Sequence, residues 1–300
     1  ADERFGLVRV LDNLSTGFAE NIAHHLSNPK FEFIQADIRD YETCLAACEG
    51  MDFVSHHAAL GSVPRSISDP LSTNAVNITG LLQVLQAAKE SGVRRMVYAA
   101  SSSTYGDSLE LPKVEDRIGK PLSPYAVTKY VNELYASVYA RTFGIELIGL
   151  RYFNVFGPRQ SPQGAYAAAI PLFIQQLSNG TSPTIHGDGS HSRDFTFVDN
   201  AVQANLKALF SENKAALGEV FNIAFGQQTT LLELFEMLRN LLNVSTPAHF
   251  GPERLGDIPH SHASIEKARA ILGYSPEISI EDGLRQTVAW YQGISNHPSI

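Results

Sequence analysis

Several features are scarce in this sequence, and each absence narrows the class of protein. Only two of the 300 residues are cysteines, Cys44 and Cys48. They lie four apart in a predicted helix, which favours two small buried side chains over a disulfide or a metal pair. No stretch resembles a secretory signal, and no apolar run approaches the ~18 residues of a membrane-spanning helix. Lys and Arg total 23 against 31 Asp and Glu, so the net charge of −8 opposes attraction to nucleic acid or anionic lipid. We therefore expect a cytoplasmic protein without a metal, nucleic-acid or membrane partner.

Strand-like and helix-like segments alternate over the first half of the chain. Short apolar runs typical of buried strands occur at 7–11, 31–34, 53–56, 95–99 and 145–150. Helical stretches lie between them, at 41–48, 69–91 and 124–143. This alternation predicts an α/β fold, a Rossmann-like doubly wound parallel sheet. Beyond Asn154 the alternation becomes irregular. We therefore predict a first domain of residues 1–154 and a smaller α/β domain formed mainly by 155–300, with some segments returning to the first.

One element of such a fold is missing from the sequence. Dinucleotide-binding sheets open with a strand, a glycine-rich turn and a helix whose N-terminus holds the pyrophosphate. Neither G-x-G-x-x-G nor G-x-x-G-x-x-G occurs anywhere in the 300 residues. We therefore expect that the chain starts at the second strand of such a fold, without about 30 residues of opening strand and helix. We also expect weakened binding of a dinucleotide, because the backbone donors aimed at its pyrophosphate are absent.

Two segments carry side chains suited to proton transfer. Tyr125 and Lys129 lie four apart in a predicted helix entered through Ser123-Pro124, so the phenol and the ammonium share one face. A cation beside a phenol favours the phenolate, so we expect the pKa of Tyr125 to fall below its usual value of about 10. Upstream, three hydroxyls follow an apolar strand, at the edge where open α/β sheets bind ligands: Ser101, Ser102 and Ser103. Each pattern by itself is also typical of a solvated helix face or a hydroxyl-rich turn.

Taken in order along the chain, these segments resemble the extended short-chain dehydrogenases/reductases. The shared pattern comprises Asp12-Asn13, Asp37-Ile38, His56-His57-Ala58-Ala59, Asn77 with Gly80, the serine run, Tyr125-xxx-Lys129, and Arg151 to Pro158. Within this superfamily the chain is most similar to the UDP-N-acetylglucosamine 4-epimerases of bacterial surface-polysaccharide pathways, especially over 58–66 and 122–134. The resemblance covers essentially all 300 residues, and the missing glycine-rich turn is its departure from the pattern.

The resemblance implies NAD as a bound catalyst and assigns three catalytic residues. Ser101 would hydrogen-bond the sugar hydroxyl that is oxidised, Tyr125 would take its proton as hydride leaves the fourth carbon, and Lys129 would hold the nicotinamide ribose. The 4-keto sugar would then turn over and receive the hydride on its other face. Asp12 would bind the adenosine ribose hydroxyls, because a carboxylate there suits NAD. The full set of implied cofactor contacts is Asp12, Asn13, Asp37, Ile38, Ala58, Ala59, Asn77, Tyr125, Lys129 and Tyr152.

The resemblance also implies contacts with a UDP-sugar and a subunit partner. Arg193 would bind the diphosphate, Arg254 would supply a second cation for the nucleotide, and Ser261 would leave room for an acetamido group. The implied substrate contacts are Ser102, Ser103, Asn154, Gln160, Arg193, Arg254, Asp257 and Ser261. In the family the helices at 69–91 and 124–143 pair across a two-fold axis, so we expect a homodimer.

Alternatives from other classes stay open at this stage. Relatives that dehydrate or decarboxylate nucleotide sugars carry a carboxylate in the turn that here reads Ser101 to Ser103, so epimerisation fits this chain better. We expect reversible 4-epimerisation of UDP-GlcNAc and UDP-GalNAc, with their uronic acids as further candidates. The alternatives are a UDP-glucose/UDP-galactose 4-epimerase and a non-catalytic fragment that binds nucleotide sugars.

Overall fold

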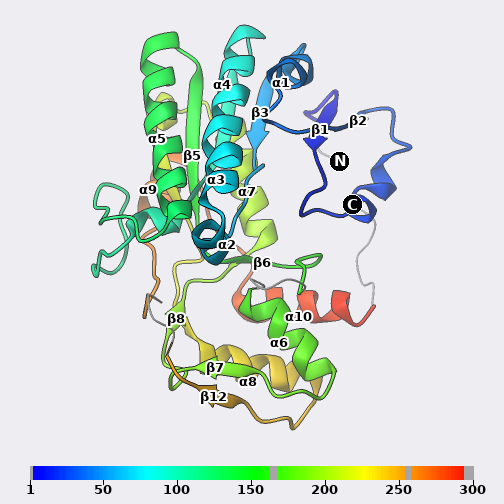
Figure 1. The fold of residues 1–300 in the computed structure, drawn as a ribbon, viewed down its shortest axis with the longest axis vertical. Helices are drawn as coiled ribbons and strands as arrows, with labels where there is room; N and C mark the ends of the chain where they lie inside the picture. Colours follow the sequence, from blue (N-terminus) through cyan, green and yellow to red (C-terminus); the bar gives the residue numbers. More distant parts are fainter. Residues whose placement is uncertain (1–2, 163–167, 254–257, 294–300) are drawn as a thin grey trace.

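A four-stranded parallel sheet forms the centre of the molecule (Figure 1). The computed structural model describes residues 3–162, 168–253 and 258–293. The sheet has the order β10-β5-β4-β3, and its strands are β3 (Phe53–His56), β4 (Arg95–Ser101), β5 (Glu146–Tyr152) and β10 (Val220–Ile223). β4 and β5 are buried along most of their length, as expected for parallel strands covered on both faces. The predicted α/β fold with a parallel sheet is thus observed.

Two further parallel strands lie beside this sheet and are not hydrogen-bonded to it. Within the described residues β1 (Val8–Asp12) pairs only with β2 (Phe31–Gln35). A groove of about 750 Å³ is lined by all five residues of β1 on one side and all four of β3 on the other. These six strands thus form two separate parallel sheets, and the expectation of an absent opening strand stays a prediction.

Helices cover both faces of the central sheet. The first face carries α1 (Tyr41–Cys48), α4 (Leu81–Glu90) and α5 (Pro124–Phe143), and the second carries α7 (Val198–Leu209) and α9 (Glu266–Leu272). α5 begins and ends where its sequence dictates. Ser123 accepts a hydrogen bond from the N–H of Ala126, Pro124 occupies the first turn, and Gly144 ends the helix at φ 71°. Cys44 and Cys48 are buried free thiols in the core beneath α1, as expected.

The single helix predicted at 69–91 is wrong in detail. The segment forms α3 (Pro70–Asn74), a π-helical stretch at Ala75–Gly80 and then α4, and it follows a short helix α2 (Val63–Ser68). The widened turns carry the buried Asn77, whose amide bonds to neighbouring segments. At Gly80 a Cβ would lie 2.5 Å from the Cδ1 of Ile38, so only glycine allows this close approach.

A second apolar core gathers the later part of the chain, in the lower part of Figure 1. Its helices are α6 (Ala169–Ser178), α8 (Leu231–Leu242) and α10 (Ile280–Tyr291). Short strand pairs join it, namely β6 (Val155–Phe156) with β9 (Thr196–Phe197), β7 (Thr184–His186) with β12 (His249–Gly251), and β8 (Ser192–Arg193) with β11 (Thr229–Thr230). Single helical turns occur at Ala19–Asn21, Ala23–His25, Ser102–Tyr105 and Lys214–Ala216. The predicted division at 154/155 stays a prediction. No helix among the described residues is long and apolar enough to cross a membrane.

Candidate active site

Ser101, Tyr125 and Lys129 meet at the carboxyl end of β4. Ser101 is the last residue of β4, and Tyr125 and Lys129 lie one turn apart at the start of α5, which packs on that strand. The ammonium of Lys129 donates a hydrogen bond to the carbonyl of Ala99, at 2.8 Å, two residues before Ser101. Burial raises the pKa of the Tyr125 phenol, and Ser101 lies close enough to offset part of that rise. The structure therefore brings the three predicted catalytic residues together.

The serine turn prepares Ser101 as a hydrogen-bond donor. Its Oγ accepts two hydrogen bonds from Ser103, one from the backbone N–H at 3.1 Å and one from the hydroxyl at 2.9 Å. A hydroxyl has two acceptor lone pairs and one proton, so the proton of Ser101 is the group left to donate. Ser102 lies beside Ser103 in the same helical turn.

Burial sets the proton affinities of the site. It raises the pKa of Tyr125, and it lowers the pKa of Lys129 to about 8. The expectation from spacing, a net lowering of the Tyr125 pKa by the ammonium, is wrong here. Desolvation of the phenol raises its pKa by more than Ser101 lowers it. The ammonium of Lys129 is directed to the carbonyl of Ala99 instead of the phenol. Burial and the nearby ammonium lower the pKa of His56 to about 3, so this imidazole is neutral.

Asp12, Asn13 and Asp37 gather at the carboxyl ends of β1 and β2. The amide of Asn13 donates to Oδ2 of Asp37 at 3.0 Å, and Oδ1 of Asp12 accepts the N–H of Leu14 at 2.6 Å. Two hydrogen bonds from the guanidinium of Arg39, at 2.9 and 2.7 Å, hold the pKa of the Asp37 carboxyl well below its usual range. Arg39 was not among the predicted residues, although its position two after Asp37 is visible in the sequence.

The groove between β1 and β3 reaches this cluster. Its lining includes Asp12, Ile38, His57 and Ala58, together with the facing edges of the two strands. Ile38 is buried, whereas Ala58 and Ala59 are half-buried in the loop that follows β3. The predicted cofactor contacts Asp12, Ile38 and Ala58 thus line this groove, and Ala59 follows directly after its lining.

Asn77 and Tyr152 are bound to protein groups rather than directed into open space. Asn77 accepts the N–H of Leu60 at 2.8 Å, and its amide donates to the carbonyl of Leu60 at 3.2 Å and to Oγ1 of Thr128 at 3.1 Å. It therefore ties the loop after β3 to α5. The phenol of Tyr152 accepts a hydrogen bond from Asn205 at 2.7 Å and stacks on His57 with the ring centroids 6.0 Å apart.

Asn154 and Arg193 lie together on the side of the second core. Asn154 has φ +38°, uncommon for a residue other than glycine, and its amide donates to the carbonyl of Asp194 at 3.0 Å. Arg193 donates to the carbonyls of Ser192 and Pro259, at 2.9 and 3.2 Å. The backbone N–H of Ser261 donates to the carbonyl of Ser192 at 3.0 Å. Three of the predicted substrate contacts are thus neighbours.

Gln160 lies near the same core but is bound differently. Its amide donates to the carbonyl of Val155 at 3.3 Å, while its side-chain oxygen is buried without a hydrogen-bond partner. The predicted contacts Arg254 and Asp257 lie outside the described residues.

Asp194 is a buried polar residue that the sequence reasoning missed. Its carboxylate accepts three backbone hydrogen bonds, from Phe225, Gly226 and Ala263. Its place directly after Arg193 was the only signal in the sequence, since its partners are 31 to 69 residues further along the chain.

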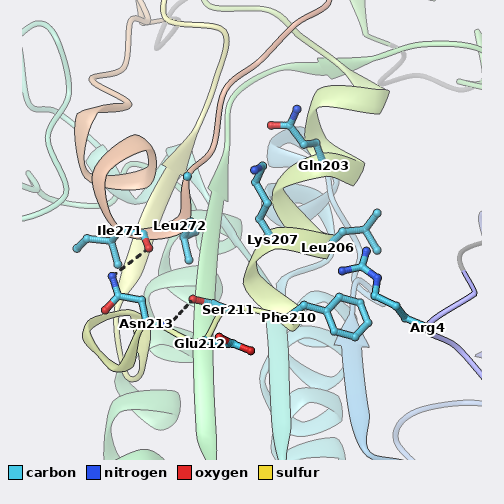
Figure 2. Close-up of a pocket in the computed structure, with 11 residues that line it drawn as sticks. Arg4, Gln203, Leu206, Lys207, Phe210, Ser211, Glu212, Asn213, Ile271 and Leu272 are labelled. Atoms are coloured by element: carbon cyan, nitrogen blue, oxygen red, sulfur yellow. Dashed lines mark hydrogen bonds between the residues drawn. The ribbon is translucent and has the colours of Figure 1, made fainter.

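A second hollow, of about 590 Å³, shares Arg4 with the groove between β1 and β3. It lies at the C-terminal ends of α7 and α9, and none of the predicted site residues lines it. Figure 2 shows Arg4 reaching toward Phe210 there, with the guanidinium 3.9 Å from the ring centroid. In the described part of the chain no group of three or more His, Cys, Asp or Glu could hold a metal ion.

Comparison with known proteins identifies the class to which this fold and site belong. The model of the NAD dependent epimerase/dehydratase family matches residues 3–224. The chain therefore belongs to the NAD-dependent epimerase/dehydratase family. This membership confirms the prediction of an enzyme with a Rossmann-like fold and with NAD as its cofactor.

Individual relatives match over nearly the whole chain. The UDP-glucose 4-epimerase of Mycolicibacterium smegmatis is 36% identical, over 95% of this chain and 90% of the relative. The UDP-N-acetylglucosamine 4-epimerase of Methanobrevibacter ruminantium M1, solved in complex with UDP-N-acetylmuramic acid, has a TM-score of 0.91 and 36% identity. It covers 95% of this chain and 90% of its own. The UDP-glucose 4-epimerase of Thermus thermophilus, solved with NAD, has a TM-score of 0.85 and 33% identity, with coverages of 95% and 91%.

The residues present fit the two ends of NAD but offer no glycine-rich turn for its centre. Asp12, at the end of β1, is exposed and retains acceptor capacity for ribose hydroxyls. At the other end, Lys129 and Tyr125 provide a donor and a hydroxyl beside β4. The sequence contains no G-x-G-x-x-G turn to supply backbone donors to the pyrophosphate between them.

Proposed function

We infer that this protein is a UDP-sugar 4-epimerase that interconverts UDP-GlcNAc and UDP-GalNAc, with the corresponding uronic acids as further substrates. The observation that carries the proposal is the meeting of Ser101, Tyr125 and Lys129 at the carboxyl end of β4. Hydroxyl, phenol and ammonium are the groups needed to move a proton on and off a sugar hydroxyl. Residues 1–154 hold the cofactor and 155–300 mainly the UDP-sugar.

The proposed chemistry is an oxidation that is afterwards reversed. Bound NAD would supply the redox chemistry, as acceptor and then donor of the hydride at the fourth carbon of the sugar. Ser101 donates a hydrogen bond to the reacting hydroxyl, and Tyr125 takes the proton of that hydroxyl. Lys129 supplies positive charge one turn away from Tyr125. As the resemblance to the short-chain dehydrogenases/reductases implies, it also holds the nicotinamide ribose. After the 4-keto sugar has turned over, Tyr125 gives the proton back, so no net oxidation results.

The carboxylates near the site argue for epimerisation over dehydration or decarboxylation. The turn at Ser101 to Ser103 contains hydroxyls only. Glu115 accepts the N–H of Asn222 at 2.8 Å, and Glu133 forms a buried pair with Arg151 at 2.7 Å. Both carboxylates are thus engaged by protein groups. Elimination of water needs a further acid and base beside the tyrosine, which these groups do not provide.

The preference for an N-acetyl sugar rests on Ser261. In galactose-type epimerases the resemblance places a bulky tyrosine near this position, whereas a serine leaves space for an acetamido group and offers it a hydrogen bond. The segment of Ser261 is fixed against β8, next to Arg193. Relatives of both kinds match this chain, and activity on UDP-glucose and UDP-galactose is the alternative.

A homodimer is part of the proposal. Of the exposed apolar side chains of α5, three lie at helical spacing on one face: Val127, Leu134 and Val138. Ile67 of α2 and Leu71 of α3 are also exposed, at 64% and 81%, and both helices pack beside α5. A second copy of this face would cover them across a two-fold axis.

Epimer formation followed by NMR tests the proposal. Purified protein, with and without added NAD, is incubated separately with UDP-GlcNAc and UDP-glucose, and Tyr125→Phe is the matched inactive control. We expect formation of UDP-GalNAc that depends on bound or added NAD. Product formed without any bound or added cofactor, or unchanged turnover by Tyr125→Phe, contradicts the mechanism. UDP binding without turnover in the presence of NAD supports the non-catalytic alternative.

A further inference from the structure

Asp194 lies at the junction of three segments from distant parts of the chain. It connects β8 to β9, and its side chain is fully buried. Its Oδ1 accepts the N–H groups of Phe225 and Gly226, both at 3.1 Å, and its Oδ2 accepts the N–H of Ala263 at 3.2 Å. One carboxylate thus fixes the loop after β10 and the segment before α9 to the β8–β9 connection.

The expected substrate contacts are attached to this junction. Arg193 is the residue before Asp194, and the amide of Asn154 donates to the Asp194 carbonyl at 3.0 Å. Ser261 lies two residues before Ala263, and its N–H is bound to the carbonyl of Ser192. Residues of three different segments are therefore fixed next to one another around a single side chain.

Resting on the proposed function, we propose that Asp194 is a positioning residue for the UDP-sugar. Its carboxylate holds residues 258–263 against Arg193 and Asn154, in the arrangement that grips the diphosphate and places Ser261 beside the sugar. Asp194 acts through the backbone N–H groups that it binds and does not itself touch the substrate.

The chemistry of the junction fits a role in binding rather than in stability alone. Desolvation raises the pKa of the Asp194 carboxyl to about 6, while its N–H partners and the nearby His262 oppose the rise. An ionised carboxylate at this depth is costly at neutral pH, and an uncharged side chain avoids that cost. His262 and Ser192 add local hydrogen bonds, with Gly226 at 3.2 Å and His260 at 2.9 Å. Ser192 also bonds to both segments, through Gln228 at 2.8 Å and His260, whereas Asp194 binds backbone N–H groups of both through one carboxylate.

The test is the isosteric variant Asp194→Asn, compared with the wild-type chain. An amide presents one oxygen and one NH₂, so at least one of the three N–H groups loses its acceptor and faces a donor. We expect hydrogen exchange at Ala263, or at Phe225 and Gly226, to accelerate more than tenfold. We expect calorimetric affinity for UDP to fall at least tenfold, while the urea midpoint stays the same or rises. The control is Asp188→Asn, in an exposed turn where the carboxylate accepts the N–H of Ser190 at 2.9 Å. This variant should change neither hydrogen exchange at Phe225, Gly226 and Ala263 nor the affinity for UDP.

The outcomes separate this inference from the proposed function. Unchanged exchange and unchanged UDP affinity in Asp194→Asn overturn the inference, as does a loss of protection that extends over β4 and β5. Should Asp194→Asn not fold, Asp194→Glu decides: weaker UDP binding with local loop exposure supports the role, and wild-type behaviour overturns it. A wild-type chain that binds no UDP contradicts the proposed function. In that case the hydrogen exchange of Asp194→Asn, compared with wild type, still shows whether Asp194 fixes the two loops.

Discussion

The ammonium of Lys129 is held in the site at a cost in stability, and its removal should reveal that cost. Burial lowers its pKa from 10.5 to about 8, so the folded state binds this proton more weakly than the unfolded state does. Folding therefore loses stability wherever the unfolded lysine is protonated. The cost is complete below pH 8 and disappears as the pH rises to the ordinary value of 10.5.

The magnitude follows from the size of the shift. Lowering this pKa from 10.5 to about 8 costs roughly 3 kcal/mol at pH 7 and roughly 1 kcal/mol at pH 9.5. Replacing Lys129 by methionine removes this cost, but it also removes the hydrogen bond to the Ala99 carbonyl, worth about 1 kcal/mol. We expect Lys129→Met to be about 2 kcal/mol more stable than wild type at pH 7 and nearly equal to it at pH 9.5.

Urea unfolding of both proteins at the two pH values measures this difference. His56 has a pKa of about 3 and stays neutral throughout, and other titrating groups are common to both proteins and cancel. The variant should also lose epimerase turnover, because the positive charge beside Tyr125 is gone. A stability difference that is independent of pH, or a variant less stable than wild type at pH 7, would refute the reasoning.

Three further predictions concern substrate choice, the buried ion pair and the dimer. Ser261→Tyr should suppress turnover of N-acetyl sugars selectively, and equal losses on all four UDP-sugars would show that Ser261 does not line the sugar site. Glu133→Gln should lower the free energy of unfolding by about 3–5 kcal/mol in urea titrations, because the buried guanidinium of Arg151 loses its charged partner. A loss below ~1 kcal/mol, as expected for an exposed pair, contradicts this. Leu134→Glu should yield monomers in sedimentation velocity, whereas Leu232→Glu, exposed on α8, should leave a dimer. Identical sedimentation of the two variants contradicts the dimer face.

Local sequence signals predicted the elements that build the catalytic cluster. The helix predicted at 124–143 is observed at Pro124–Phe143, because Ser123 and Pro124 are strong local signals for its start. Spacing of four then places Tyr125 and Lys129 on one face. The apolar run ahead of Ser101 likewise predicted a strand that delivers its hydroxyl to the same edge.

What escaped prediction depends on contacts between distant residues. The π-helical turns at Ala75–Gly80 are stabilised by bonds of Asn77 to Leu60 and Thr128, which no local pattern reveals. The direction of the Tyr125 pKa shift depends on burial, which spacing alone does not give. Asp194 gathers its partners from two loops that are brought beside it only by the folded sheet.

The central claim, that the sugar is oxidised and reduced again at its fourth carbon within one site, is tested most directly with UDP-GlcNAc deuterated at that carbon. Incubation with the protein and NAD in ordinary water, followed by NMR of the product, reports the fate of the label. The account predicts UDP-GalNAc that retains its deuterium at the fourth carbon, because the hydride is removed and returned without exchange. Product in which this deuterium has been replaced by hydrogen from water would contradict it.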